Sequence, residues 1–146
     1  MKLPAPRPGL VIRYAFLWRA DHAKGADTGA KDRPCAIVVA ARRTESGEID
    51  TIVAPITHRA PDDSAASIEI PAATCKALGL DDGRHWLRLD ELNRFAWPGF
   101  GLRPIPKKPS KCDYGMLPPG LFAKLRDGIL ARQKAKPRRI VRRDED

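Results

Sequence analysis

The sequence predicts a mainly β protein with a C-terminal helix and one short additional helix. Two observations lead to this class. Five or six short segments between residues 10 and 90 are rich in β-branched and aromatic residues or alternate apolar with polar positions. One longer amphipathic segment, residues 121–134, follows them. A chain of 146 residues suits a single domain, and so many short strands around one small core predict a strongly bent, barrel-like sheet.

The first predicted strand covers residues 10–18. Its alternate positions place five apolar residues on one face: Leu10, Ile12, Tyr14, Phe16 and Trp18. The polar residues 19–32 that follow contain Gly25 and Gly29 and predict a long hairpin loop.

The second predicted strand, residues 35–40, contains no charge and begins directly after Arg33 and Pro34. The arginine side chain keeps its proton, and its planar fork matches two phosphate oxygens. Proline restricts the residue before it to extended backbone, so Arg33 enters the strand in a fixed direction. We therefore expect a phosphate-binding group at the start of a buried strand. A surface arginine at a strand end is the alternative.

Further strands are predicted over residues 51–57 and 67–70, and a short helix over 72–78. Gly79 suits a left-handed cap at the end of that helix. Within residues 84–90, Leu87 and Leu89 alternate with Trp86, Arg88 and Asp90. If the leucines face inward, Arg88 and Asp90 should point outward together.

Residues 98–119 hold six prolines and three glycines, which predicts mostly irregular backbone. The helix over 121–134 then shows one apolar stripe: Leu121, Phe122, Leu125, Ile129 and Leu130. Residues 135–146 have too few apolar side chains to pack, so we expect a basic, disordered tail. The predicted organisation is one barrel domain over 1–134 and this tail.

The net charge and the cysteine pattern limit the classes of function that the protein can have. The formal net charge is +9, and the chain from residue 132 onward carries seven basic and three acidic residues. This points to an anionic partner, nucleic acid or acidic protein, with a solubilising tail as the alternative. Three scattered cysteines without zinc-site spacing suit a reducing cytosol and predict no metal or cofactor. We expect a cytoplasmic protein, because no signal-peptide or membrane-span pattern is present.

Three separated pieces resemble the toxins of PemK/MazF-type toxin–antitoxin systems. The first runs from Pro8 and Gly9 through the strand and loop to Arg33 and Pro34. The second is residues 53–57, Val-Ala-Pro-Ile-Thr, and the third is residues 88–90, Arg-Leu-Asp. The order and spacing of these pieces span about residues 8–133.

This resemblance implies an SH3-like barrel of the PemK/MazF/CcdB type, assembled as a homodimer. It also implies a metal-independent endoribonuclease that cleaves single-stranded RNA and inhibits growth, with a cognate antitoxin as partner. The loop over 21–31 lacks the Gly-x-Glu-Gln sequence that is common in the family. A second hypothesis is therefore a non-catalytic SH3-like module that binds RNA or protein, including a gyrase-targeting toxin.

Metal-free RNA cleavage needs a base for the 2′-hydroxyl, stabilisation of the phosphorane and an acid for the leaving oxygen. The resemblance carries phosphate binding over to Arg33 and Thr57, although Thr57 also reads as an ordinary strand threonine. Asp90 serves as base if its surroundings raise its pKa, with Arg88 as acid or charge stabiliser. The alternative for Arg88 and Asp90 is a surface ion pair.

Histidine titrates nearest to neutral pH, so His58 is a candidate acid or base. Within a strand it would turn away from Thr57, unless the strand ends there. His22 lies in the long loop, and both histidines also read as exposed loop residues, whereas His85 reads as a packed residue. We further expect Lys31, His22, Lys24 and Trp97 to contact RNA, Trp97 by stacking on bases, with a dimer or core contact as its alternative.

Overall fold

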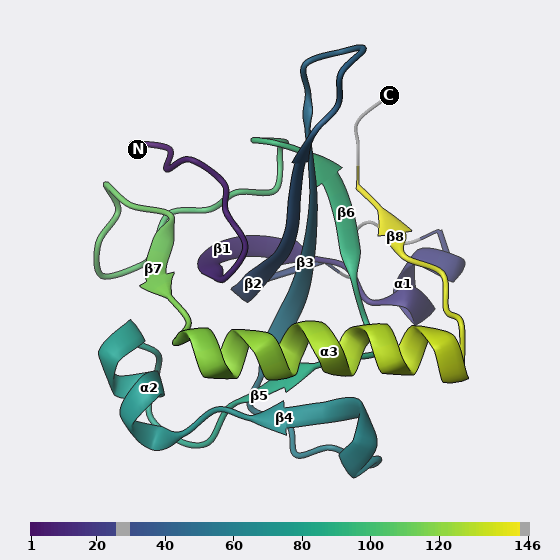
Figure 1. Ribbon diagram of the computed structural model, residues 1–146. Helices are drawn as coiled ribbons and strands as arrows, with labels where there is room; N and C mark the ends of the chain where they lie inside the picture. Colours follow the sequence, from purple (N-terminus) through teal and green to yellow (C-terminus); the bar gives the residue numbers. More distant parts are fainter. Residues whose placement is uncertain (26–29, 144–146) are drawn as a thin grey trace.

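The computed structural model describes residues 1–25 and 30–143 as a curled antiparallel half-barrel with a C-terminal helix (Figure 1). Part of the first loop, residues 26–29, and the last three residues of the expected tail lie outside the described part. In chain order the elements are β1 (Leu10–Phe16), α1 (Arg19–Ala23), β2 (Lys31–Arg42), β3 (Ile49–Thr57), the 3₁₀ turn η2 (Ser64–Ala66), β4 (Ser67–Glu69), α2 (Ala72–Leu78), β5 (Trp86–Arg88), β6 (Asn93–Ala96), β7 (Asp113–Met116), α3 (Pro119–Ala135) and β8 (Val141–Arg142).

Strand β3 is the branch point of the sheet. The main path of hydrogen-bonded neighbours is β4-β5-β3-β2-β1-β7. One side of β3 pairs with β2, whereas its other side pairs first with β6, over residues 50–53, and then with β5, over residues 56 and 57. This change of partner opens the sheet into two arms, and α3 crosses in front of them (Figure 1).

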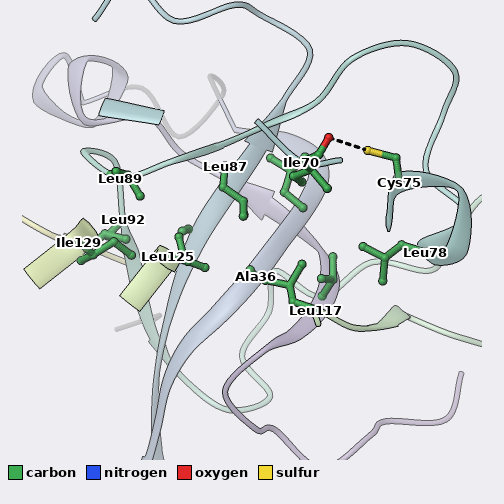
Figure 2. Close-up of a cluster of buried hydrophobic side chains, with 13 residues drawn as sticks. Ala36, Ile70, Cys75, Leu78, Leu87, Leu89, Leu92, Leu117, Leu125 and Ile129 are labelled. Carbon is green, nitrogen blue, oxygen red and sulfur yellow. Dashed lines mark hydrogen bonds between the residues drawn. The ribbon is translucent and has the colours of Figure 1, made fainter. Parts of the chain in front are cut away.

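The two faces of the sheet support separate apolar clusters, because successive residues of a strand point to opposite sides. One face packs against α2 and α3 in a cluster that includes Ala36 and Ile56 of the sheet and Leu125 and Ile129 of α3. Figure 2 labels Ala36, Leu125 and Ile129. The other face holds Cys35 and Val53 together with Phe95 and the apolar face of β1. The predicted grouping of Leu10, Ile12, Tyr14 and Phe16 with Trp18 is confirmed.

Several local predictions are confirmed. Helix α2 ends at Gly79, which adopts φ +71° as the left-handed cap. Leu87 and Leu89 are buried, and Arg88 and Asp90 lie on the opposite side of the chain from them, half-buried. The mainly β class with a short helix and a C-terminal helix is also confirmed.

The apolar stripe of α3 is narrower than predicted. Leu125 is fully buried and Ile129 nearly so, but Leu130 is 58% exposed. A helix turns by about 100° per residue, so Leu130 lies well round the helix from Ile129. The apolar cluster beneath α3 does not extend that far, and the inclusion of Leu130 in the stripe was wrong.

The predicted disordered tail is corrected over its described part. Val141 and Arg142 form β8, which pairs in parallel with β6, and Val141 is 1% exposed. The backbone N–H groups of Val141 and Arg143 donate to the carbonyls of Leu92 and Arg94, at 3.0 and 2.8 Å. One buried valine and a short ladder therefore dock a segment whose composition alone indicated disorder.

Two irregular regions also contain short elements. The expected loop after β1 begins with the helical turn α1, and its last two residues already belong to β2. The Pro-rich region contains β7, which pairs with β1 at the edge of the sheet.

Candidate functional site

Lys31, Arg33 and Thr57 form a wall shared by two neighbouring cavities of about 240 and 780 Å³. The ladder between β2 and β3 explains the meeting of these residues. Cys35 pairs with Pro55, and Arg33 and Thr57 each lie two residues further toward the same end of the ladder. The start of β2 and the end of β3 thus bring a cation and a hydroxyl to one place.

Arg33 is a half-buried cation that stacks on an aromatic ring. Its guanidinium carbon lies 5.0 Å from the centre of the Trp18 ring, and its buried Nε has no hydrogen-bond partner. Among residues 1–25 and 30–143 it forms no ion pair. Burial lowers the pKa of Arg33 from its ordinary value, because desolvation disfavours the charged form. An anion in the cavity would relieve this desolvation.

The hydroxyl of Thr57 is oriented toward donation. The Arg59 backbone N–H donates to Thr57 Oγ1 at 3.1 Å, which occupies one lone pair of the oxygen. The hydroxyl proton remains available for another acceptor. Thr57 can therefore serve as a second donor beside Arg33 for the same anion.

Two imidazoles lie next to this wall in the smaller cavity. The rings of His58 and His85 are 4.2 Å apart. The His58 Nδ1–H donates to the carbonyl of Arg84 at 3.1 Å, and because a carbonyl only accepts, Nδ1 must carry the proton. In the neutral ring the lone pair is then on Nε2. His58 shares the cavity with Thr57 because β3 ends at Thr57 and the strict alternation of faces stops there.

His85 is the inner member of this pair, and it is packed as predicted, with 3% exposure. Burial is the larger cause that lowers its pKa, and the neighbouring His58 adds to the effect. His85 therefore stays neutral at neutral pH and offers His58 an uncharged neighbour.

Arg88 and Asp90 form a closed pair in the larger cavity. The Arg88 Nε–H and Nη2–H donate to the two carboxylate oxygens at 2.8 and 2.9 Å, and the Arg88 guanidinium carbon lies 5.3 Å from the Trp18 ring centre. Burial alone would raise the pKa of Asp90, but the hydrogen bonds and charge of Arg88 outweigh burial and lower it. The raised pKa that a base at Asp90 requires is not met here.

The other predicted RNA contacts are dispersed. Lys31 lies in the shared wall, but His22 in α1 and Lys24 at its end line neither cavity. Trp97 also lies outside both cavities and stacks on Phe95, with ring centres 6.2 Å apart. The structure thus brings together Lys31, Arg33, Thr57 and His58, with Arg88 and Asp90 in the adjoining cavity, and leaves His22, Lys24 and Trp97 apart.

Sequence reasoning missed several lining residues. Trp18 was assigned only to a strand face, yet the guanidinium groups of Arg33 and Arg88 both stack on its ring. Arg13 donates to the Tyr114 hydroxyl at 3.2 Å in the smaller cavity, across a pairing of distant strands. Arg132, Lys136 and Arg138 line the larger cavity, and only the density of basic residues near the C-terminus hinted at them.

Within the described ranges, no group of three or more histidine, cysteine or acidic side chains is arranged to hold a metal ion. None of the described helices combines the length and the apolar character needed to cross a membrane. Searches with protein-family models, among curated proteins and among solved structures found no match to this chain.

Proposed function

We propose that this protein is a metal-independent endoribonuclease that cleaves single-stranded RNA at the wall of Lys31, Arg33 and Thr57. The guanidinium of Arg33 carries the proposal, because it stacks on Trp18 where two cavities join and forms no ion pair with any residue of the ranges 1–25 and 30–143. A phosphodiester supplies the missing charge, and two of its oxygens match the guanidinium fork.

The neighbouring side chains can complete a transfer of the phosphoryl group. Nε2 of His58 takes the proton of the 2′-hydroxyl, and the 2′-oxygen attacks phosphorus. Arg33 and Thr57 donate to the phosphorane oxygens, whose negative charge grows at this point. The bond from phosphorus to the 5′-oxygen then breaks, leaving a 2′,3′-cyclic phosphate and a 5′-hydroxyl.

The leaving 5′-oxygen needs a proton, and we assign this role to Lys31. Of the three residues in the shared wall, Lys31 alone carries a charge that is also a usable acid, since guanidinium holds its proton more tightly than ammonium. Arg88 stacks on Trp18 and is bound by Asp90, and both residues line the larger cavity instead of moving protons.

The experiment is incubation of single-stranded RNA of mixed sequence with the folded protein in EDTA, followed by analysis of the product ends. We expect 5′-hydroxyl and cyclic or 3′-phosphate ends with wild type. We expect a loss of about 100-fold or more with Arg33→Ala and with His58→Ala. Arg126→Ala, on the exposed side of α3, is the matched control for loss of an arginine.

The order of the sequence pieces that resemble PemK/MazF toxins supports the wider biological role. In this role the protein inhibits growth by cutting messenger RNA, acts as a homodimer, and is held inactive by a cognate antitoxin. Growth arrest on induction, relieved by Arg33→Ala, tests the toxin role, and sedimentation of the purified protein tests the dimer.

The closed Arg88–Asp90 pair favours a second candidate, a non-catalytic module that binds RNA or protein. A carboxylate with both oxygens engaged by arginine is a poor base. Salt-sensitive RNA binding with no product after long incubation would support this module and overturn the nuclease. Gyrase inhibition without RNA cleavage would assign a protein target instead.

A further inference from the structure

The larger cavity extends from Arg33 to a second basic wall at the end of α3. Arg132 in the last turn of the helix, and Lys136 and Arg138 just after it, line this wall. Figure 1 shows the end of α3 and the segment leading to β8 on the same side of the molecule as α1. Both basic walls line the same cavity of about 780 Å³.

The second wall is held in place by its backbone. The Lys136 N–H donates to the Arg132 carbonyl at 2.8 Å, and the Arg138 N–H donates to the side-chain oxygen of Gln133 at 3.2 Å. The docking of β8 against β6 fixes the chain beyond Arg138. The side chains of Lys136 and Arg138 thus project from an anchored segment.

The charges of this wall are only partly neutralised. Arg132 pairs with Asp63 at 3.1 Å, and its buried Nε has no hydrogen-bond partner. Lys136 and Arg138 form no ion pair with any residue of the ranges 1–25 and 30–143. Lys136 also interacts electrostatically with Asp63, so this one carboxylate acts on both Arg132 and Lys136. The three cations of the wall line the cavity that Arg33 also lines.

We propose that Lys136 and Arg138 form a second phosphate subsite, which binds the backbone of the same RNA strand a few nucleotides from the scissile phosphate. This inference rests on the proposed function for the identity of the ligand. A polynucleotide repeats its phosphates along one chain, so it can reach both basic walls of one cavity at once. A dinucleotide, with a single phosphodiester, reaches only one of them.

The experiment compares wild type with Lys136→Ala/Arg138→Ala. The control is Lys124→Ala/Arg126→Ala, which removes the same two charges from exposed positions of α3 outside both cavities. Binding of a fully 2′-O-methylated single-stranded oligonucleotide is measured at several salt concentrations, because this probe cannot be cleaved. Cleavage of a long RNA and of a dinucleotide is measured in parallel.

We expect the plot of log Kd against log salt to lose about 1.4 of its slope in Lys136→Ala/Arg138→Ala, about 0.7 for each lost phosphate contact. The ratio of kcat/KM for the long RNA to that for the dinucleotide should fall as well. The control should keep both the wild-type slope and the ratio. A slope and ratio that match the control would overturn the subsite even if the protein cleaves RNA.

Failure of the nuclease proposal can also be distinguished from failure of the subsite proposal. Loss of slope in a protein that produces no cleavage would support the subsite and overturn the nuclease. Binding of polyglutamate, without binding of the oligonucleotide, would overturn the subsite in favour of an acidic protein partner.

Discussion

At the scale of single residues, the position of Arg33 is unusual because a charge is held half-buried against an aromatic ring. Stacking on Trp18 compensates little of the lost hydration, since cation–π contacts contribute on the order of 1–2 kcal/mol. The shape of the side chain should matter here as much as its charge.

Arg33→Lys tests this directly. Lysine keeps the positive charge but lacks the planar fork and stacks poorly on Trp18. We expect kcat for RNA cleavage to fall by about 10² to 10³, the range for loss of one donor to a developing oxyanion. Steady-state kinetics of Arg33→Lys beside Arg33→Ala measure it, and near wild-type cleavage by the lysine variant would refute a role for the fork.

His85 should make folding stability depend on pH. Burial, with a smaller contribution from His58, lowers the pKa of His85 in the folded protein. Below pH about 6.5, the ordinary pKa of histidine, the unfolded chain therefore binds a proton at this residue more readily than the folded chain does. The contribution of His85 to the unfolding free energy is fully present above that pH, and it declines as the pH falls below it. The His58 ring lies 4.2 Å from that of His85. Asp81 and a hydrogen bond with the Gly83 backbone oppose the lowering of the His85 pKa without reversing it.

The measurement is urea unfolding near pH 7.5 and near pH 5 for wild type, His85→Gln and the control His22→Gln. We expect the drop in unfolding free energy to be smaller in His85→Gln than in the other two proteins. An equal drop in all three would place the pH sensitivity elsewhere.

At the scale of elements, α3 depends on a narrow contact with the sheet. Leu125 is fully buried in the cluster of Figure 2, whereas Leu130 is mostly exposed. We expect Leu125→Ala to lower the unfolding free energy by about 2–5 kcal/mol and Leu130→Ala to change it by about 0.5 kcal/mol or less. Chemical denaturation of both variants checks this, and similar losses would mean that the stripe is wider than the structure has it.

Strand β8 should protect its amides. The Val141 and Arg143 N–H groups donate to the carbonyls of Leu92 and Arg94, so their hydrogen exchange should be slower than that of Arg139, which lies between α3 and β8 in no helix or strand. Exchange measured by NMR or by mass spectrometry resolves this. Rates equal to those of an unstructured peptide would restore the expectation of a free tail.

The elements that the sequence predicted well are those fixed by local geometry. Alternation in residues 84–90 correctly separated Leu87 and Leu89 from Arg88 and Asp90, because the period of two belongs to the strand itself. The strand at Val141 was missed because its partner, β6, lies far away in the sequence. Few apolar residues surround it, so no local pattern marked it.

In the candidate site too, some residues could be predicted from local sequence and others required the tertiary structure. Arg33 could be selected because it precedes a charge-free strand segment, whereas Thr57 was a candidate only through the resemblance. The ladder between β2 and β3 brings the two residues together. An ion pair was one of the two alternatives for Arg88 and Asp90, and only the structure shows both carboxylate oxygens engaged by the guanidinium. The basic wall at Lys136 and Arg138 required the packing of α3 and β8 to be known.

At the scale of the whole molecule, all three cysteines are buried and unpaired, in different parts of the fold. Burial raises the pKa of each thiol, most strongly at Cys35, so the reactive thiolate is scarce in the native state. We expect a thiol reagent such as DTNB to react slowly with the native protein and to titrate three thiols after unfolding. Fast reaction of one thiol in native protein would indicate local opening around it.

The wall shared by the two cavities affects the choice of buffer for activity assays. A small oxyanion that settles on Lys31, Arg33 and Thr57 occupies donors of both cavities at once. Sulfate and phosphate buffers would therefore act as competitive inhibitors, and a screen run in them would miss a working enzyme. A chloride salt with an uncharged or cationic buffer such as Tris is the medium in which activity should first be sought.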